Sequence, residues 1–281
     1  MAVMIIDSHL HVYADDESQF PYVAGGKPSR PASVEYLLPL MDEAGVDRAV
    51  IVQPRTYSWD NRYLAHCIER FSDRFTALGL VDPGAADGPD RLEELIRERG
   101  FSGLRLELGW EEDLDDFHSE DRWPLWERAQ ELGAVFGILG SLKDHSCVEP
   151  MAQRFPGVMI LLDHLNGLPL DPEQQEPLIA ATLRHASYPN VFVKVSNLQG
   201  KSGDEYPFRD TYDLVRRIYD VYGPERLLWG SDFPGVMASC GYVNAVELVR
   251  THMPFLTDDD KEWILHGTAE KVFRFSRTPR G

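Results

Sequence analysis

The stretch AVFGIL at residues 134–139, followed after a helical segment by VMILLD at residues 158–163, decides the fold. Both runs are short and almost wholly apolar, and turn signals stand before them: Gly133 before the first, and Pro156 with Gly157 before the second. Near-continuous apolar strands that alternate with amphipathic helices are typical of a parallel sheet covered by helices. These residues therefore predict a strand–helix–strand unit of an α/β protein.

The same alternation extends along the chain in both directions. Strands are predicted at Val3–Asp7, Ala49–Gln53, Phe75–Val81, Ser102–Leu108, Ala134–Leu139, Val158–Asp163, Val191–Ser196 and Leu227–Ser231. Amphipathic helices are predicted at Val34–Ala44, Asn61–Phe71, Pro89–Arg99, Trp123–Leu132, Val148–Phe155, Pro177–His185 and Thr211–Tyr222. Eight such units favour a closed (β/α)8 TIM barrel over an open doubly wound sheet, because a barrel of this kind takes about 250 residues. We expect a single domain over residues 1–281.

The composition argues against several classes of protein. The 28 basic and 46 acidic residues give a formal net charge of −18, so the basic surface of a nucleic-acid-binding protein is absent. No apolar run reaches the roughly 18–20 residues that span a bilayer. Cys67, Cys147 and Cys240 form no CxxC pair, which argues against a cysteine zinc site and fits a reducing compartment. With no basic signal region at the start, we expect a cytoplasmic protein; its oligomeric state stays open, a homo-oligomer included.

Two histidines follow the first predicted strand, in the run DSHLH at residues 7–11. Residues i and i+2 of an extended chain point to the same side, so His9 and His11 would present two imidazoles at the barrel mouth. Such a pair can bind a divalent metal or polarise a carbonyl oxygen. Two solvent-facing loop histidines are the alternative, but the place at the head of an eight-strand pattern favours a functional role, since barrel active sites lie at the carboxyl ends of the strands.

Two further polar residues follow other predicted strands. His164 ends the run ILLDH, and Asp232 ends the run LLWGSD. Because a barrel closes its eighth strand onto its first, Asp232 is expected to face the two histidines, where it could hold a metal or take a proton from water. The structural alternatives are a core histidine with its hydrogen bonds satisfied and a helix-capping aspartate.

The run GLRLEL at residues 103–108 places charges inside the predicted barrel. Strict alternation sends Arg105 and Glu107 to the interior, and Lys194 is inward by the same rule. Buried charges need partners, so a Glu107–Lys194 or Arg105–Glu107 pair is the structural alternative. The functional interpretation is that Arg105 binds a substrate carboxylate through its bidentate fork.

The loop after the second strand, QPRTY at residues 53–57, offers two more substrate-binding candidates. Arg55 is a second anion-binding group, and Tyr57 is expected to line the substrate pocket. Because the chain as a whole is acidic, a few local arginines must attract an anion against an unfavourable overall field. We therefore expect a small anionic molecule as the partner.

Taken together, these motifs resemble one known family. The runs IIDSHLHVY, GLRLEL, LLDHLNG, RLLWGSDFP and HGTAEKVF, in this order over most of the chain, are similar to the amidohydrolase-2 family of the amidohydrolase superfamily. The resemblance implies a TIM-barrel enzyme. The family includes metal-dependent decarboxylases of the aminocarboxymuconate semialdehyde decarboxylase type. It also includes lactonases of the 2-pyrone-4,6-dicarboxylate lactonase and L-fuconolactonase types.

One departure separates these branches. The decarboxylases carry a metal-binding histidine at the end of the fifth strand, whereas AVFGILG at residues 134–140 has none and His145 lies several residues further on. The resemblance therefore favours the lactonases, which can work without a metal, and we expect no required cofactor. The alternative is one divalent metal, Zn²⁺ or Mn²⁺, bound by His9, His11 and Asp232.

The predicted reaction is hydrolysis of a small carboxylated or sugar-derived lactone. Asp232 would activate a water molecule, while His9, His11 and His164 would polarise the carbonyl group and stabilise the oxyanion. Two alternatives stay open. One is a metal-dependent decarboxylase or hydrolase of a small aromatic-catabolism acid with a mononuclear divalent metal, and the other is a non-catalytic ligand-binding barrel.

Overall fold

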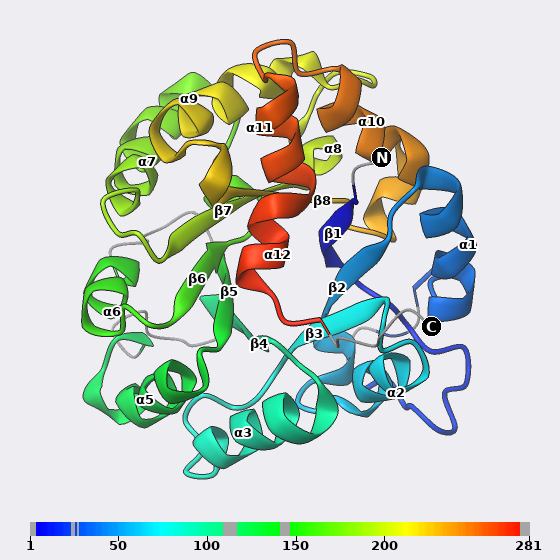
Figure 1. The fold of residues 1–281 in the computed structure, drawn as a ribbon, viewed down its shortest axis with the longest axis vertical. Helices are drawn as coiled ribbons and strands as arrows, with labels where there is room; N and C mark the ends of the chain where they lie inside the picture. Colours follow the sequence, from blue (N-terminus) through cyan, green and yellow to red (C-terminus); the bar gives the residue numbers. More distant parts are fainter. Residues whose placement is uncertain (1–3, 24–25, 27, 109–116, 141–146, 276–281) are drawn as a thin grey trace.

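The computed structural model describes residues 4–23, 26, 28–108, 117–140 and 147–275. Within these residues, eight parallel strands follow one another in sequence order around a barrel (Figure 1). They are β1 (Ile6–Leu10), β2 (Arg48–Val52), β3 (Phe75–Gly79), β4 (Gly103–Leu108), β5 (Val135–Gly140), β6 (Met159–Leu162), β7 (Val191–Ser196) and β8 (Leu227–Gly230). The (β/α)8 fold expected from the sequence is confirmed.

Helices surround the strands in Figure 1. They are α1 (Val34–Ala44), α2 (Arg62–Arg70), α3 (Gly88–Arg99), α5 (Trp123–Leu132), α6 (Val148–Arg154), α7 (Pro172–His185), α8 (Leu198–Lys201), α9 (Tyr212–Tyr222), α10 (Tyr242–Thr251), α11 (Asp258–Glu262) and α12 (Thr268–Val272). Apart from α11 and α12, their apolar faces pack on the outer faces of the strands in a large buried core. Among the described residues, no helix has both the length and the hydropathy to cross a membrane.

The barrel closes between β8 and β1. The Asp232 amide donates a hydrogen bond to the His9 carbonyl over 2.9 Å, and the His11 amide donates to the Phe233 carbonyl over 2.7 Å. Gly230 permits this approach, because a Cβ at that position would lie 2.7 Å from His9 Cβ and 3.0 Å from His9 N. Closure therefore brings the segment after β8 directly onto the histidines of β1.

The lower end of the barrel interior is filled with apolar side chains. Residues at or near the first positions of the strands, among them Ile6, Phe192 and Leu228, form a second buried cluster with Val272 and Phe273 at the end of α12. In Figure 1 α12 lies across the strands, as expected for a helix that covers this end. Polar chemistry is thereby confined to the opposite end, where the strands finish.

The expected bounds of β7, α1 and α5 agree with the structure, and most others differ by one or two residues. The expected strand at Val3–Asp7 is wrong, since β1 runs from Ile6 to Leu10. A criterion based on apolar runs ends a strand at its first polar residue, whereas Asp7, Ser8 and His9 are all buried inside β1. Polar residues can occupy such positions when they have internal partners.

The helix expected at Pro177–His185 also starts earlier, at Pro172. The Asp171 side chain accepts a hydrogen bond from Gln174 N over 3.1 Å and so caps the helix. Pro172 stands in the first turn, where no amide donor is needed. Pro177, the first residue of the expected helix, lies inside the observed one.

A Gly230→Ala variant tests the closure. The added Cβ overlaps His9, so we expect it to destabilise the protein by about 1–3 kcal/mol, as overpacking of a tight contact does. Gly203→Ala is the matched control, because its Cβ would come no closer than 3.8 Å to Asp210. Urea unfolding measures both; equal midpoints for Gly230→Ala and the wild type would contradict the closure described here.

Candidate active site

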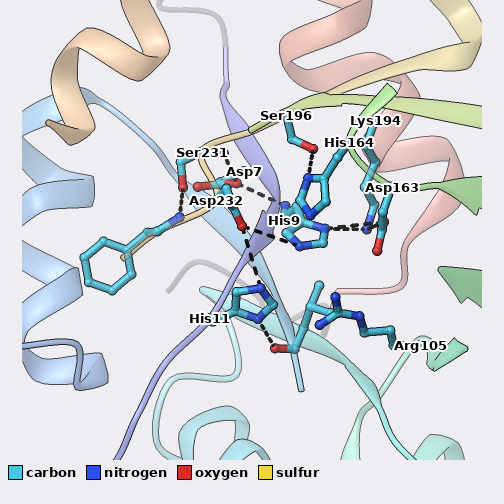
Figure 2. A network of polar contacts seen from close by, with 12 residues as sticks. Asp7, His9, His11, Arg105, Asp163, His164, Lys194, Ser196, Ser231 and Asp232 are labelled. Carbon is cyan, nitrogen blue, oxygen red and sulfur yellow. Dashed lines mark hydrogen bonds and ion pairs between the residues drawn. The ribbon is translucent and has the colours of Figure 1, made fainter. Parts of the chain in front are cut away.

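The four residues expected to form the site come together at the carboxyl ends of β1, β6 and β8. The ring centroid of His9 lies 5.1 Å from that of His11 and 4.5 Å from that of His164. Asp232 Oδ1 lies 3.9 Å from His9 Nε2 and 3.7 Å from His11 Nε2. Figure 2 shows the His9 ring at the centre of this group, with Asp232 on one side and Lys194 on the other.

Two of these residues have backbone conformations that few side chains adopt. His164 has φ 55° and Asp232 has φ 57°, both in the left-handed region. Such a conformation costs on the order of 1–3 kcal/mol for a non-glycine residue and persists where the surroundings impose it. For Asp232 the hydrogen bond of its amide to the His9 carbonyl provides that constraint.

The proton position on His11 follows from its partner. Its Nδ1 lies 2.8 Å from the Val52 carbonyl oxygen. A carbonyl oxygen only accepts, so Nδ1 carries the proton and Nε2 keeps its lone pair, which points towards Asp232. Burial lowers the pKa of His11 to about 3, and the Arg105 charge adds to this effect. His11 is therefore a neutral imidazole.

His9 has its Nδ1 beside two charged groups. Lys194 Nζ lies 3.1 Å from this nitrogen and Asp163 Oδ1 lies 3.4 Å from it. Its Nε2 has no hydrogen-bond partner among the described residues. Burial holds the pKa of His9 well below its usual range, although the negative charge of Asp163 opposes the shift.

His164 and Asp232 complete the set. The Nδ1 of His164 lies 2.9 Å from Ser196 Oγ, and burial lowers the pKa of this histidine to about 4. Burial raises the pKa of Asp232 to about 7, against the opposing charge of Arg105. A carboxylate held at the mouth beside neutral imidazoles is a suitable proton acceptor.

Sequence reasoning missed Asp163 and mispaired Lys194. One of the two structural alternatives paired Lys194 with Glu107, but the Lys194 ammonium lies 2.9 Å from Asp163 Oδ1, and both side chains are fully buried. Burial favours the protonated form of Asp163, but the Lys194 charge, together with the interactions with His9 and His164, outweighs it, so the pKa of Asp163 lies well below its usual range. The only sequence signal was the position of Asp163 at the end of an apolar strand, directly before His164.

Asp7 was also missed as a functional position. Its Oδ1 accepts hydrogen bonds from the amides of Ser231, over 3.0 Å, and His9, over 3.1 Å. Its Oδ2 accepts one from the Tyr242 hydroxyl over 2.8 Å. Asp7 therefore ties β1 to the segment that carries Asp232, and the signal for it was an aspartate two residues before the first histidine.

The two arginines lie at one edge of the site and share a carboxylate. Arg55 Nε pairs with Glu107 Oε2, and Arg105 Nε lies 3.2 Å from Glu107 Oε1. The Arg105–Glu107 pair anticipated as an alternative thus exists. The Arg105 side chain is almost fully buried, whereas that of Arg55 is 47% exposed. The two guanidinium groups therefore meet at one edge of the site, and part of Arg55 is open to solvent there.

Tyr57 does not take the place expected for it. Its side chain is only 1% exposed, and its hydroxyl accepts a hydrogen bond from Ala14 N over 2.7 Å. Its ring contacts those of Tyr13, Tyr22 and Tyr63. The structure therefore gives Tyr57 a role in fixing the loop after β1, because its surface is already used in packing. His145 lies outside the described residues.

A pocket of about 380 Å³ adjoins Arg105 and Glu107. Apolar side chains contribute much of its lining, including Trp59, Phe117 and Trp126. This volume is near the lower end of the range of about 300–1,000 Å³ for small-molecule sites. Neither the three histidines nor Asp232 is among its lining residues, so the pocket lies beside the group around His9.

The residues present also fit a divalent metal. One ligand atom each from His9, His11 and Asp232 can be chosen so that all lie within 4.8 Å of one another. Two neutral imidazoles and a carboxylate are ligands that Zn²⁺ accepts, and three protein ligands are usual in catalytic zinc sites. The expectation that no metal is needed therefore gains no support from the geometry, whereas the alternative metal site gains some.

Comparisons with known proteins place the chain in a family. The model of the family described as amidohydrolase matches residues 6–275. L-fucono-1,5-lactonase of Burkholderia ambifaria is 30% identical over 82% of this chain and 80% of its own length. The 2-pyrone-4,6-dicarboxylate hydrolase of Comamonas testosteroni is 25% identical over 82% of this chain and 76% of its own.

A solved structure agrees in fold. An amidohydrolase of Burkholderia multivorans, crystallised with bound zinc, superposes with a TM-score of 0.82 and 22% identity, over 97% of this chain and 100% of the other. Since the family model extends from β1, which carries His9, to beyond α12, it covers every residue of the site. The chain therefore belongs to the amidohydrolase family and is an enzyme, a hydrolase.

Proposed function

We propose that this enzyme hydrolyses the ester bond of a small lactone that carries a carboxylate. The observation that carries the proposal is the position of Asp232, whose Oδ1 lies within 4 Å of the Nε2 atoms of both His9 and His11. The names of the relatives, a fuconolactonase and a pyrone-dicarboxylate hydrolase, support a cyclic ester as substrate. The arginine pair at the edge of the site supports the carboxylate.

Asp232 acts as the general base. It takes a proton from water as the water oxygen bonds to the lactone carbonyl carbon. The tetrahedral intermediate then expels the ring oxygen, which receives the proton back from Asp232. The ring opens to a hydroxy acid, and Asp232 returns to its carboxylate form. The His11 proton is held on Nδ1 by the Val52 carbonyl, so His11 Nε2 has a lone pair that can accept a hydrogen bond from the attacking water.

His9 and His164 supply the hydrogen-bond donors for the oxyanion. The Lys194 ammonium beside His9 Nδ1 leaves the His9 proton on Nε2. The Ser196 hydroxyl can donate to His164 Nδ1, which leaves the His164 proton on Nε2 as well. Preorganised donors of this kind are each worth about 10²–10³ in kcat. The histidines thus divide into two donors and one acceptor, rather than three equivalent groups.

A divalent metal would bind through His9, His11 and Asp232. When bound, it supplies Lewis-acid polarisation of a carbonyl and lowers the pKa of water. The zinc found in the Burkholderia multivorans amidohydrolase of the same fold supports Zn²⁺ as the ion. The proton transfers at Asp232 and the binding of the substrate carboxylate remain tasks of the protein.

Replacing the base tests the mechanism. Asp232→Asn removes the proton acceptor but keeps the size of the side chain, so we expect kcat to fall by about 10²–10⁴ with little change in KM. Asp73→Asn, at an exposed position, is the control. Acid release from L-fucono-1,5-lactone and from 2-pyrone-4,6-dicarboxylate measures the rate. Near-normal hydrolysis by Asp232→Asn, or release of carbon dioxide by the wild type, would contradict the proposal.

The anion-binding role of Arg105 is tested by comparing substrates. Arg105→Met removes a charged hydrogen-bond donor worth about 1.5–3 kcal/mol, so KM for the carboxylated lactone should rise about 10–100-fold. KM for the uncharged sugar lactone should change far less. Arg62→Met is the control, since Arg62 is exposed and paired with Asp60. An equal loss on both substrates would show that Arg105 only supports the fold.

Metal binding has a direct test. Titration of the metal-stripped protein with Zn²⁺ against a coloured chelator should show one ion bound per chain. His11→Asn removes one of three protein ligands and should weaken zinc binding by about tenfold or more. His66→Asn, in α2 and outside the site, should leave it unchanged. Unaltered zinc affinity in His11→Asn would rule out this ligand set.

A further inference from the structure

Lys194 is a buried charge behind the His9 ring. It projects from β7 into the interior and is 0% exposed. Its ammonium lies 2.9 Å from Asp163 Oδ1 and 3.1 Å from His9 Nδ1, so the three groups form a closed triangle behind the His9 ring (Figure 2). The reaction proposed above uses Lys194 only through this contact with His9.

The fold makes room for this ammonium. Strand β5 has a glycine, Gly137, at the facing position, where a Cβ would lie 2.9 Å from Leu78 Cδ1 and 3.8 Å from Lys194 Nζ. A larger side chain on β5 would compete for the space that the end of Lys194 fills. A buried ammonium is costly unless it is paired, and Asp163 supplies the pairing.

The contact with His9 fixes one proton. An ammonium group has three donors and no acceptor, so Lys194 and His9 form a hydrogen bond only when His9 Nδ1 is the acceptor. A neutral imidazole carries a single proton, which is then on Nε2, the nitrogen that faces Asp232. A protonated nitrogen cannot bind a metal, because metal ligands must offer a lone pair.

Asp163 favours the opposite arrangement. Its Oδ1 lies 3.4 Å from the same His9 Nδ1. With the proton on Nδ1, Asp163 accepts it and His9 Nε2 becomes free to bind a metal, as in the carboxylate–histidine–metal arrangement of many metal sites. Lys194 and Asp163 therefore compete for one nitrogen, and the outcome selects between a hydrogen-bond donor and a metal ligand.

We infer that Lys194 is a positioning residue that holds the His9 proton on Nε2 and thereby limits the affinity of this site for a divalent metal. The inference rests on the proposed function in that it concerns the same His9, but it predicts a binding equilibrium rather than a rate. The fixed positive charge of Lys194 acts in the same direction, since it repels a cation bound on the other side of the His9 ring.

The test compares two variants with opposite expected effects. Lys194→Met removes the donor and should tighten Zn²⁺ binding about tenfold or more, while Asp163→Asn removes the negative acceptor and should weaken it about tenfold, as loss of such an outer partner does. Lys201→Met is the matched control, because Lys201 is a second largely buried lysine whose ammonium donates to the Leu168 carbonyl over 2.9 Å and does not contact His9. Zn²⁺ alone is the probe, in competition with a chelator.

A second measurement shows which nitrogen of the His9 ring carries the proton. Histidine ring ¹⁵N spectra of the metal-free protein, with the His9 signals identified from a His9→Asn variant, should show the Nε2–H form in the wild type and the Nδ1–H form in Lys194→Met. Thermal unfolding confirms that each variant is folded. If Lys194→Met does not fold, Lys194→Leu, which also removes every donor to His9 Nδ1, replaces it with the same expected direction.

Zinc affinity tests the role of Lys194, whereas lactone hydrolysis tests the proposed function. Zinc affinity that is unchanged or weakened in a folded Lys194 variant overturns the inference, since a residue with a purely structural role would loosen the site in both variants. Lactone hydrolysis by the wild type is measured separately. Its absence would remove the proposed function while the zinc titrations and the spectra still decide the role of Lys194.

Discussion

The structure depends on the hydrogen bonds that join β1 to the segment after β8. Asp7 sits at the centre of this junction, where one carboxylate accepts from Ser231, His9 and Tyr242. Closing a ring of parallel strands requires the last strand to meet the first, and here the same contacts set the distance between Asp232 and the histidines. The contacts that close the barrel are therefore the same contacts that assemble the site. A change that loosens the junction moves the proposed base relative to both His9 and His11.

Much of this arrangement could be predicted from the sequence, because it depends on local patterns. Short, mostly apolar runs identified the strands, with wrong bounds for the first, and the rule that barrel sites lie at strand ends predicted that His9, His11, His164 and Asp232 lie together. Parity along β4 placed Arg105 and Glu107 on the same side correctly. These inferences use the period of a strand and the closure of a barrel, and both are properties of the chain itself.

What could not be predicted depends on which buried group meets which. From the alternation of side chains alone, Lys194 could pair with Glu107 or with Asp163. The partner is Asp163, and this depends on where each residue lies along the barrel axis. The strand β1 was misplaced for the same reason: whether Asp7 is tolerated inside a strand depends on Ser231 and Tyr242, more than 200 residues away. Tyr57 looked like a pocket residue because nothing local shows that its hydroxyl meets Ala14 N.

The apolar cluster at the end of the barrel where the strands begin limits how small molecules can reach the site. Because Val272 and Phe273 pack with the first residues of the strands, the interior below Lys194 and Asp163 is solid protein. Among the described residues, the barrel interior is therefore closed at the end where the strands begin. As far as the described residues show, the substrate, water and product of the proposed reaction would enter and leave at the end where the strands finish, so a product that still occupies this end would delay the next substrate.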